Sequence, residues 1–290
     1  MLALVAGEGD LPGLIMDQLD GSGTAFRLCE LEGYPSEHRG DRPIIRFRIE
    51  TLGSFIAELV RLGVTQICFA GAIGRPPLDP SKIDPATMPL VPRMMAALQQ
   101  GDDAALRTVL QFFDEAGIET VGANELGPEI LPAPGVLGKV APSDQHKKDA
   151  ERGIEIIGAM AAVDVGQACI VEGGQALAIE AQPGTDWMMR SLLQTAPEMD
   201  GRTTRSTLFG GVASEPRAKH IPKGGVLVKA AKPGQELRID MPTIGPDTVM
   251  RAVQVGLEGI VIEAGRVIVV HKESCVEIAD SHGLFLWVKE

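Results

Sequence analysis

The sequence predicts an α/β protein in which an N-terminal Rossmann-like domain with a parallel sheet precedes a C-terminal domain of mixed α+β structure. In the N-terminal part, apolar β-rich runs alternate with amphipathic helical patterns, and glycines close the helices just before the next strand. A chain of 290 residues is long enough for two domains. Pro132-Ala133-Pro134-Gly135 is the best linker candidate, which predicts domains at 1–132 and 136–290.

The elements of the N-terminal domain follow a strand, helix, strand order. The apolar spacing of Leu52, Phe55 and Leu59 is helical, and Gly63 is placed to end that helix. Right-handed crossovers would bring the carboxyl ends of all the strands to one edge of the sheet. Strands are predicted at 2–6, 25–31, 64–70 and 118–121, and helices at 14–19, 52–62 and 102–116, the last capped by Asp102.

The C-terminal part changes to shorter strands joined by close turns. Gly173-Gly174 joins strands at 168–172 and 176–180 into a predicted hairpin, and strands at 259–262 and 266–270 suggest a second one. Further strands are predicted at 225–230 and 237–240, and helices at 144–160 (capped by Asp144), 187–193 and 248–257. The basic, glycine-containing stretch 202–224 predicts a long loop, which is either a lid or binding segment or a plain insertion.

Composition excludes several classes of protein. A formal net charge of −12 and an aromatic content of 4% argue against a nucleic-acid-binding role. The scattered histidines and cysteines lack zinc-site spacing, and the isolated cysteines suggest a reducing compartment. No apolar run approaches the length of a membrane span, and the N-terminus reads as a strand rather than a signal peptide. We therefore expect a cytoplasmic protein whose contact with a membrane, if any, is peripheral.

Two glycine-rich turns follow predicted strands. The turn from Gly7 to Gly13 precedes a helix, and the turn containing Gly71 and Arg75 would face it across the sheet edge. A dinucleotide fingerprint needs G-x-G-x-x-G, but here the third glycine comes one residue late. Glu30 or Glu32 could imitate its ribose-binding acid. A nicotinamide site, a phosphate or sugar site, and a plain turn all remain open.

A second cluster combines cations with a carboxylate. Lys229 lies near the end of the strand predicted at 225–230, Lys232 comes just after that strand, and Arg238 and Asp240 would share one face of the next strand. The cations would neutralise pyrophosphate oxygens, and Asp240 could hold Mg²⁺ or orient water. The alternative is a solvated, charged strand followed by a turn.

Several short motifs occur in the order typical of one family. They are Ala6-Gly7-Glu8-Gly9-Asp10-Leu11-Pro12, Cys68-Phe69-Ala70-Gly71, Gly101-Asp102-Asp103, Leu137-Gly138-Lys139-Val140, Glu180-Ala181-Gln182-Pro183-Gly184-Thr185-Asp186, Lys229-Ala230-Ala231-Lys232-Pro233 and Arg238-Ile239-Asp240-Met241-Pro242-Thr243-Ile244-Gly245. With them, nearly the whole chain resembles the LpxI-type UDP-2,3-diacylglucosamine pyrophosphatases of lipid A biosynthesis. The resemblance implies two domains that hold a lipid-linked sugar nucleotide, a Mg²⁺ requirement, and an essential aspartate at Asp240.

The resemblance also implies the reaction. Water would attack the sugar-side phosphorus, giving UMP and 2,3-diacylglucosamine 1-phosphate. We expect Asp240, Lys229 and Arg238 to be catalytic, with Asp240 as the metal ligand. The residues expected to bind the substrate are Gly7, Gly9, Leu11, Pro12, Gly71, Arg75, Thr185, Asp186, Lys232 and Thr243. A nicotinamide-dependent oxidoreductase acting on a sugar nucleotide and a non-catalytic nucleotide-binding protein remain alternatives. Acyl-chain preference stays undecided, and a homodimer and contact with the inner membrane stay open.

Overall fold

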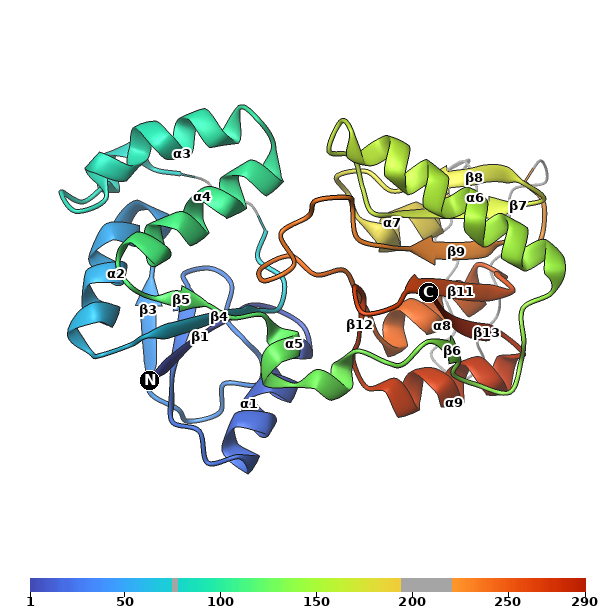
Figure 1. Ribbon diagram of the computed structural model, residues 1–290, viewed down its shortest axis with the longest axis horizontal. Coiled ribbons are helices and arrows are strands. Elements are labelled where there is room, and N and C mark those ends of the chain that lie inside the picture. The colour runs from blue at the N-terminus through green and yellow to red at the C-terminus, as the bar shows by residue number, and fades with distance from the viewer. Residues whose placement is uncertain (75–77, 194–220) are drawn as a thin grey trace, which may run out of the picture. The chain divides into compact units, whose positions relative to one another are not determined.

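The computed structural model describes residues 1–74, 78–193 and 221–290. The chain divides into two compact units (Figure 1). The first contains Met1–Ile130 together with Gly234–Met241, and the second contains Leu131–Pro233 together with Pro242–Glu290. The segment Gly234–Met241, far along the sequence, therefore belongs by its contacts to the first unit.

The first unit is built on a five-stranded sheet in the order β3-β2-β1-β4-β5. All of its strand pairs are parallel, which confirms the predicted parallel sheet. The central strand is buried along its whole length, as its continuous apolar sequence predicts. The strands are β1 (Leu2–Ala6), β2 (Phe26–Leu31), β3 (Ile44–Phe47), β4 (Gln66–Ala70) and β5 (Glu119–Thr120).

Helices α1 (Leu11–Gly21), α2 (Leu52–Arg61), α3 (Val91–Leu98), α4 (Asp102–Glu115) and α5 (Ala123–Leu126) complete this unit. Short 3₁₀ turns lie at Ile49–Thr51, Pro80–Lys82, Met88–Leu90 and Pro128–Ile130. The rings of Phe47 and Phe55 stack with centroids 4.0 Å apart in its core. Gly101, with φ 123°, is the N-cap of α4, so the prediction that Asp102 caps this helix is wrong. Asp102 is instead the first residue of the helix, where its negative charge interacts favourably with the positive end of the helix dipole.

The second unit has a six-stranded sheet in the order β6-β13-β11-β9-β7-β8. Strands β9, β11 and β13 are mutually parallel, whereas β7 and β6 run antiparallel to their neighbours β9 and β13. The predicted hairpin of β7 and β8 is confirmed. The strands are β6 (Gly135–Val136), β7 (Ala168–Glu172), β8 (Gln175–Ile179), β9 (Val226–Lys229), β11 (Gly259–Glu263) and β13 (Phe285–Lys289).

Helices cover both faces of this sheet (Figure 1). Val226 and Val228 of β9 pack in the core that includes α6, while Leu227 between them packs in the core that includes α7, α8 and α9. Ser143, not Asp144, caps α6, because its hydroxyl accepts from the His146 N–H. The helices are α6 (Asp144–Ala161), α7 (Thr185–Arg190), α8 (Pro246–Gln254) and α9 (Lys272–His282).

Two predicted strand arrangements are wrong. Strand β12 (Ile268–Val269) does not form a hairpin with β11 but pairs in parallel with β10 (Thr243–Ile244). Residues 237–240 form a turn rather than a strand, because this segment is held against α4 of the first unit instead of entering a sheet. Across the three described ranges, every helix is too short or too polar to cross a bilayer.

Candidate functional site

The two glycine turns of the first unit lie against each other. Strands β1 and β4 pair directly, and the strand order reverses between them, which in open α/β sheets marks the position of ligand crevices. The Gly7 N–H donates to the Ala70 carbonyl at 2.8 Å, and Glu8 and Ala72 exchange two backbone hydrogen bonds of 2.9 Å. A Cβ on Gly71, where φ is 90°, would lie 2.7 Å from the Glu8 carbonyl oxygen, so the close approach requires glycine.

These contacts limit what the first turn can bind. The N–H groups of Gly7 and Glu8 are used in backbone hydrogen bonds and cannot also bind a phosphate. Pro12 is buried, and its Cγ packs against Gly71, so its side chain supports the turn. Gly9, with φ 88°, has open space where a Cβ would point. The exposed part of the turn therefore lies around Gly9, with the half-buried Leu11 next to it.

The acid at the end of β2 does not resemble the ribose ligand of a dinucleotide site. Glu30 is only 2% exposed. One of its carboxylate oxygens accepts from the Ser36 N–H at 3.0 Å, and the other lies 3.5 Å from the Arg39 guanidinium. Glu32 is bonded to Arg48 at 3.0 Å. Because Glu30 is turned into the protein, the nicotinamide alternative loses one of its two candidate acids, and the other, Glu32, is paired with Arg48.

Some predicted residues lie outside the described ranges. Arg75, the predicted anion contact of the second turn, is one of them. Of the stretch 202–224, only residues 221–224 are described, so the predicted loop and its basic residues up to His220 also lie outside.

The segment Gly234–Met241 carries Asp240 and Arg238. The Gln235 side-chain amide donates both to the Asp240 carboxylate, at 2.9 Å, and to the Asp240 carbonyl, at 2.6 Å. Arg238 makes a two-pronged ion pair with Glu236, with both N···O distances 2.9 Å. The expectation that Arg238 and Asp240 share a strand face is wrong, since the chain turns between them. Hydrogen bonding to Arg238 holds the pKa of the Glu236 carboxyl below its ordinary value.

Two side chains of α4 fasten this segment to the first unit. The Asp103 carboxylate accepts from the Glu236 N–H at 3.0 Å and pairs with the Arg107 Nε at 2.7 Å. The Arg107 guanidinium also donates to the Gly234 carbonyl and lies 3.5 Å from the Glu236 carboxylate. Arg107, Gln235 and Glu236 were not among the predicted site residues. The sequence signals that point to them are Asp103 in the Gly101-Asp102-Asp103 motif and the i,i+4 spacing of Asp103 and Arg107.

The second unit brings together two of the predicted residues, Lys229 and Thr185. Lys229 ends β9 and is only 7% exposed, and its ammonium donates to the Thr185 hydroxyl at 2.8 Å. A lysine ammonium can only donate, so the single hydroxyl proton of Thr185 goes to the Glu180 carboxylate. Glu180, 6% exposed, also accepts from the Gln167 N–H at 2.7 Å. Glu180 begins one of the family motifs but was not among the predicted site residues.

The remaining predicted residues of this unit have separate surroundings. Lys232, whose side chain is 15% exposed, forms an ion pair with Asp164. Asp186 is exposed in the first turn of α7, and Thr243 is half-buried in β10. Lys229, Lys232 and Thr185 belong to the second unit, whereas Asp240, Arg238 and the glycine turns belong to the first. That they meet in one site therefore remains a prediction.

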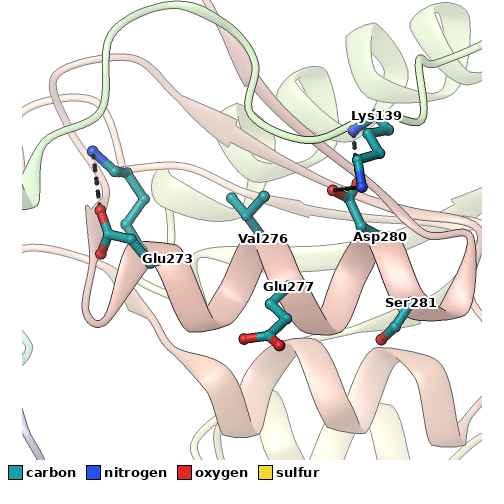
Figure 2. Close-up of a pocket in the computed structure, with 7 residues that line it drawn as sticks. Lys139, Glu273, Val276, Glu277, Asp280 and Ser281 are labelled. Atoms are coloured by element: carbon teal, nitrogen blue, oxygen red, sulfur yellow. Dashed lines mark hydrogen bonds and ion pairs between the residues drawn. The ribbon is translucent and has the colours of Figure 1, made fainter.

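A cavity of about 550 Å³ runs along α9 (Figure 2). Asp280 accepts from the Lys139 N–H at 2.6 Å on its wall, and a Cβ on Gly138 would lie 2.5 Å from the same carboxylate. The motif Leu137-Gly138-Lys139-Val140 therefore has a structural role here, and the cavity is lined by none of the predicted substrate residues. Among the described residues, there is no group of three or more His, Cys, Asp or Glu side chains that could hold a metal ion.

Comparison with known proteins covers both units. Residues 1–130 match the LpxI N-terminal domain and residues 133–287 match the LpxI C-terminal domain. The chain is 35% identical over 285 residues to the UDP-2,3-diacylglucosamine pyrophosphatase LpxI of Caulobacter vibrioides, covering 98% of this chain and 96% of that protein. With both domains matched in order and a full-length relative at this identity, the chain belongs to the LpxI family.

Proposed function

We propose that this protein hydrolyses the pyrophosphate of UDP-2,3-diacylglucosamine to UMP and 2,3-diacylglucosamine 1-phosphate. The observation that carries the proposal is the match of both LpxI domains, together with a relative of that name that is 35% identical over 98% of the chain. The buried Glu30, which accepts from the Ser36 N–H, removes one of the two candidate ribose acids of a nicotinamide site.

The nucleotide end of the substrate is assigned to the first unit. Gly9 offers open space beside the strand-order reversal, and its neighbour Leu11 is half-buried. Because Gly7 and Glu8 spend their N–H groups on the backbone, this turn suits contact with uridine or ribose better than direct binding of phosphate. Gly71 and Pro12 shape the turn from beneath.

The phosphate next to the sugar is assigned to Lys229. A lysine that is 7% exposed loses much of its hydration, which disfavours the charged form unless hydrogen bonds and a nearby anion compensate. Thr185 accepts one of the ammonium hydrogens, and the negative charge of Glu180 reaches the ammonium through that hydroxyl. We infer that this arrangement holds the Lys229 ammonium in place, so that it stabilises charge on the phosphoryl oxygens. We propose Arg238 as a second catalytic cation, and Lys232, Asp186 and Thr243 as outer contacts of the substrate.

The residues present fit a Mg²⁺ ion bound partly by the substrate. Mg²⁺ in phosphate sites commonly takes one or two carboxylates together with phosphate oxygens and water, so a single aspartate suffices on the protein side. The Asp240 carboxylate is oriented by the Gln235 amide at 2.9 Å, as ligating carboxylates usually are. We propose Asp240 as the protein ligand. When bound, the ion would neutralise negative charge on the pyrophosphate.

The bond changes follow from the substrate. The water oxygen forms a bond to the sugar-side phosphorus while the bond from that phosphorus to the bridging oxygen breaks. The bridging oxygen leaves as part of UMP, and the water proton is released to solvent. Because the substrate is acylated, we also propose a cytoplasmic enzyme that reaches its substrate by peripheral contact with a lipid surface.

The test is direct incubation of the purified protein with UDP-2,3-diacylglucosamine and Mg²⁺. We expect equal amounts of UMP and 2,3-diacylglucosamine 1-phosphate, and a large loss of rate when EDTA removes the metal. Adding NADH should change nothing. No UMP from the full-length, folded protein would contradict the proposal, and NADH consumption with a sugar nucleotide would favour the oxidoreductase instead.

A further inference from the structure

We propose that Asp103 and Arg107 of α4 are positioning residues that set the place of Asp240. The inference rests on the proposed function, in which Asp240 acts on the pyrophosphate. We name Asp103, Arg107 and the parts of Glu236 and Gly234 that they bind the α4 clamp. Asp103 and Arg107 belong to the first unit and have no assigned role in the reaction.

The clamp grips the chain from two sides. Asp103 uses one carboxylate oxygen for the Glu236 N–H, at 3.0 Å, and the other for the Arg107 Nε, at 2.7 Å. Arg107 then uses its two remaining nitrogens on the Gly234 carbonyl and, at 3.5 Å, on the Glu236 carboxylate. A planar guanidinium with five fixed donors can bridge three acceptors at once in this way, which a lysine cannot do. Two backbone groups and one side chain of the segment are thereby fixed to α4.

A short path leads from the clamp to Asp240. Gln235 lies between the two clamped residues and is only 8% exposed. Its side-chain amide donates to both the carbonyl and the carboxylate of Asp240, at 2.6 and 2.9 Å. Fixing Gly234 and Glu236 therefore fixes the base of Gln235, and Gln235 fixes the carboxylate. The turn at 237–239 brings Asp240 back to Gln235 without any strand pairing, so these contacts take the place of a sheet in holding it.

The chain offers a matched control for this idea. Arg93 of α3 makes a two-pronged pair with Glu115 at the other end of α4, with both distances 2.8 Å. Its side chain is 44% exposed, against 41% for Arg107. Arg93 also lies over the Phe112 ring, so its removal takes away a ring contact as well as an ion pair. Unlike Arg107, Arg93 contacts Gln111, Phe112 and Glu115 of α4 and holds no residue of the segment 234–241 among the described contacts.

The test compares Arg107→Ala, Asp103→Ala, the double variant and Arg93→Ala in the full chain. Amide hydrogen exchange of the protein without metal or substrate should speed up across 234–241 in the clamp variants but not in Arg93→Ala. With UDP-2,3-diacylglucosamine and Mg²⁺, kcat should fall about 10- to 100-fold while KM changes less than about threefold, since small misplacement of a reacting group has effects of that size. The double variant should lose about as much kcat as the more affected single variant, because both residues hold the same segment.

Unchanged exchange in 234–241 would overturn the inference, as would faster exchange with an unchanged kcat. An equal loss of kcat in Arg93→Ala would also overturn it, because general destabilisation would then explain the result. If the proposed function is wrong, the wild-type protein itself will release no UMP. The hydrogen-exchange measurement does not depend on that reaction and still decides whether the α4 clamp holds the segment 234–241.

Discussion

Replacing Thr185 by Val should disconnect Lys229 from Glu180 with little change of shape. The substitution removes the hydroxyl that accepts from the Lys229 ammonium at 2.8 Å and donates to Glu180. Both partners are nearly buried, at 7% and 6% exposure, so water cannot easily replace the lost hydrogen bonds. Thr185→Ser is the matched control, because it keeps the hydroxyl and removes only a methyl group.

The magnitude follows from the burial and charge of the partners. A hydrogen bond to a charged, buried group contributes about 1.5 to 3 kcal/mol, so we expect Thr185→Val to lower the free energy of unfolding by about 2 to 3 kcal/mol. For a unit of this size that corresponds to a fall in Tm of about 4 to 12 °C. Thr185→Ser removes one methyl group and should cost less than about 1 kcal/mol.

The effect on the reaction should be separate from the effect on stability. Without the hydroxyl, the ammonium loses this hydrogen bond and its link to the negative charge of Glu180. We therefore expect kcat/KM of Thr185→Val to fall about 10- to 100-fold at a temperature where the variant is fully folded, with Thr185→Ser within about threefold of wild type. Thermal unfolding followed by circular dichroism and initial rates of UMP release measure the two effects. Equal Tm and equal kcat/KM for the Val and Ser variants would show that the Thr185 hydroxyl neither stabilises the fold nor supports Lys229.

Further predictions concern the first unit and the thiols. Asp240→Ala should reduce UMP release by about a thousandfold or more while Tm stays within a few degrees; near-normal turnover would remove Asp240 from the site. Gly9→Val should raise KM more than it lowers kcat. Gly117→Val is the control, because Gly117 has a similar φ (79°, against 88° for Gly9) and equally open surroundings, and it should cause the same backbone strain without raising KM. Equal KM values for the two variants would show that the Gly9 loop is a plain turn. Burial raises the pKa of every cysteine to about 12, so a thiol reagent at pH 8 should label the native protein very slowly and the unfolded protein rapidly; fast native labelling would contradict this. These thiols are Cys29, Cys68, Cys169 and Cys275.

The predicted elements that proved correct are those whose pattern is local. All five residues of β1 are buried, as its unbroken apolar run predicts, and Gly63 lies just past Leu62, the C-cap of α2. Strand β3 was not predicted, because Ile44–Phe47 is short and only half-buried and so lacks a clear apolar pattern. Leu237-Arg238-Ile239-Asp240 alternates like a strand, but the segment has no strand to pair with and is held by α4 instead. Strand β12 was assigned to the wrong partner because the pairing with β10 is set by tertiary packing.

The site residues that could be predicted are also those with a local sequence signal. The glycine turns were found because each lies directly after a strand, and sheet topology brought them together. Glu180 lies five residues from Thr185, but its buried position is visible only in the fold. Asp103 and Glu236 are 133 residues apart in sequence, and no local pattern relates them. A loop anchored by such long-range polar contacts can be recognised only once the chain is folded.

In the proposed reaction, water attacks the sugar-side phosphorus of UDP-2,3-diacylglucosamine. Hydrolysis in ¹⁸O-labelled water, with mass analysis of both products, tests it most directly, and incubation of the unlabelled products in the same water controls for later exchange. We predict that one ¹⁸O atom enters 2,3-diacylglucosamine 1-phosphate and that UMP remains unlabelled. Label in UMP would contradict the account, because the attack would then fall on the nucleoside-side phosphorus.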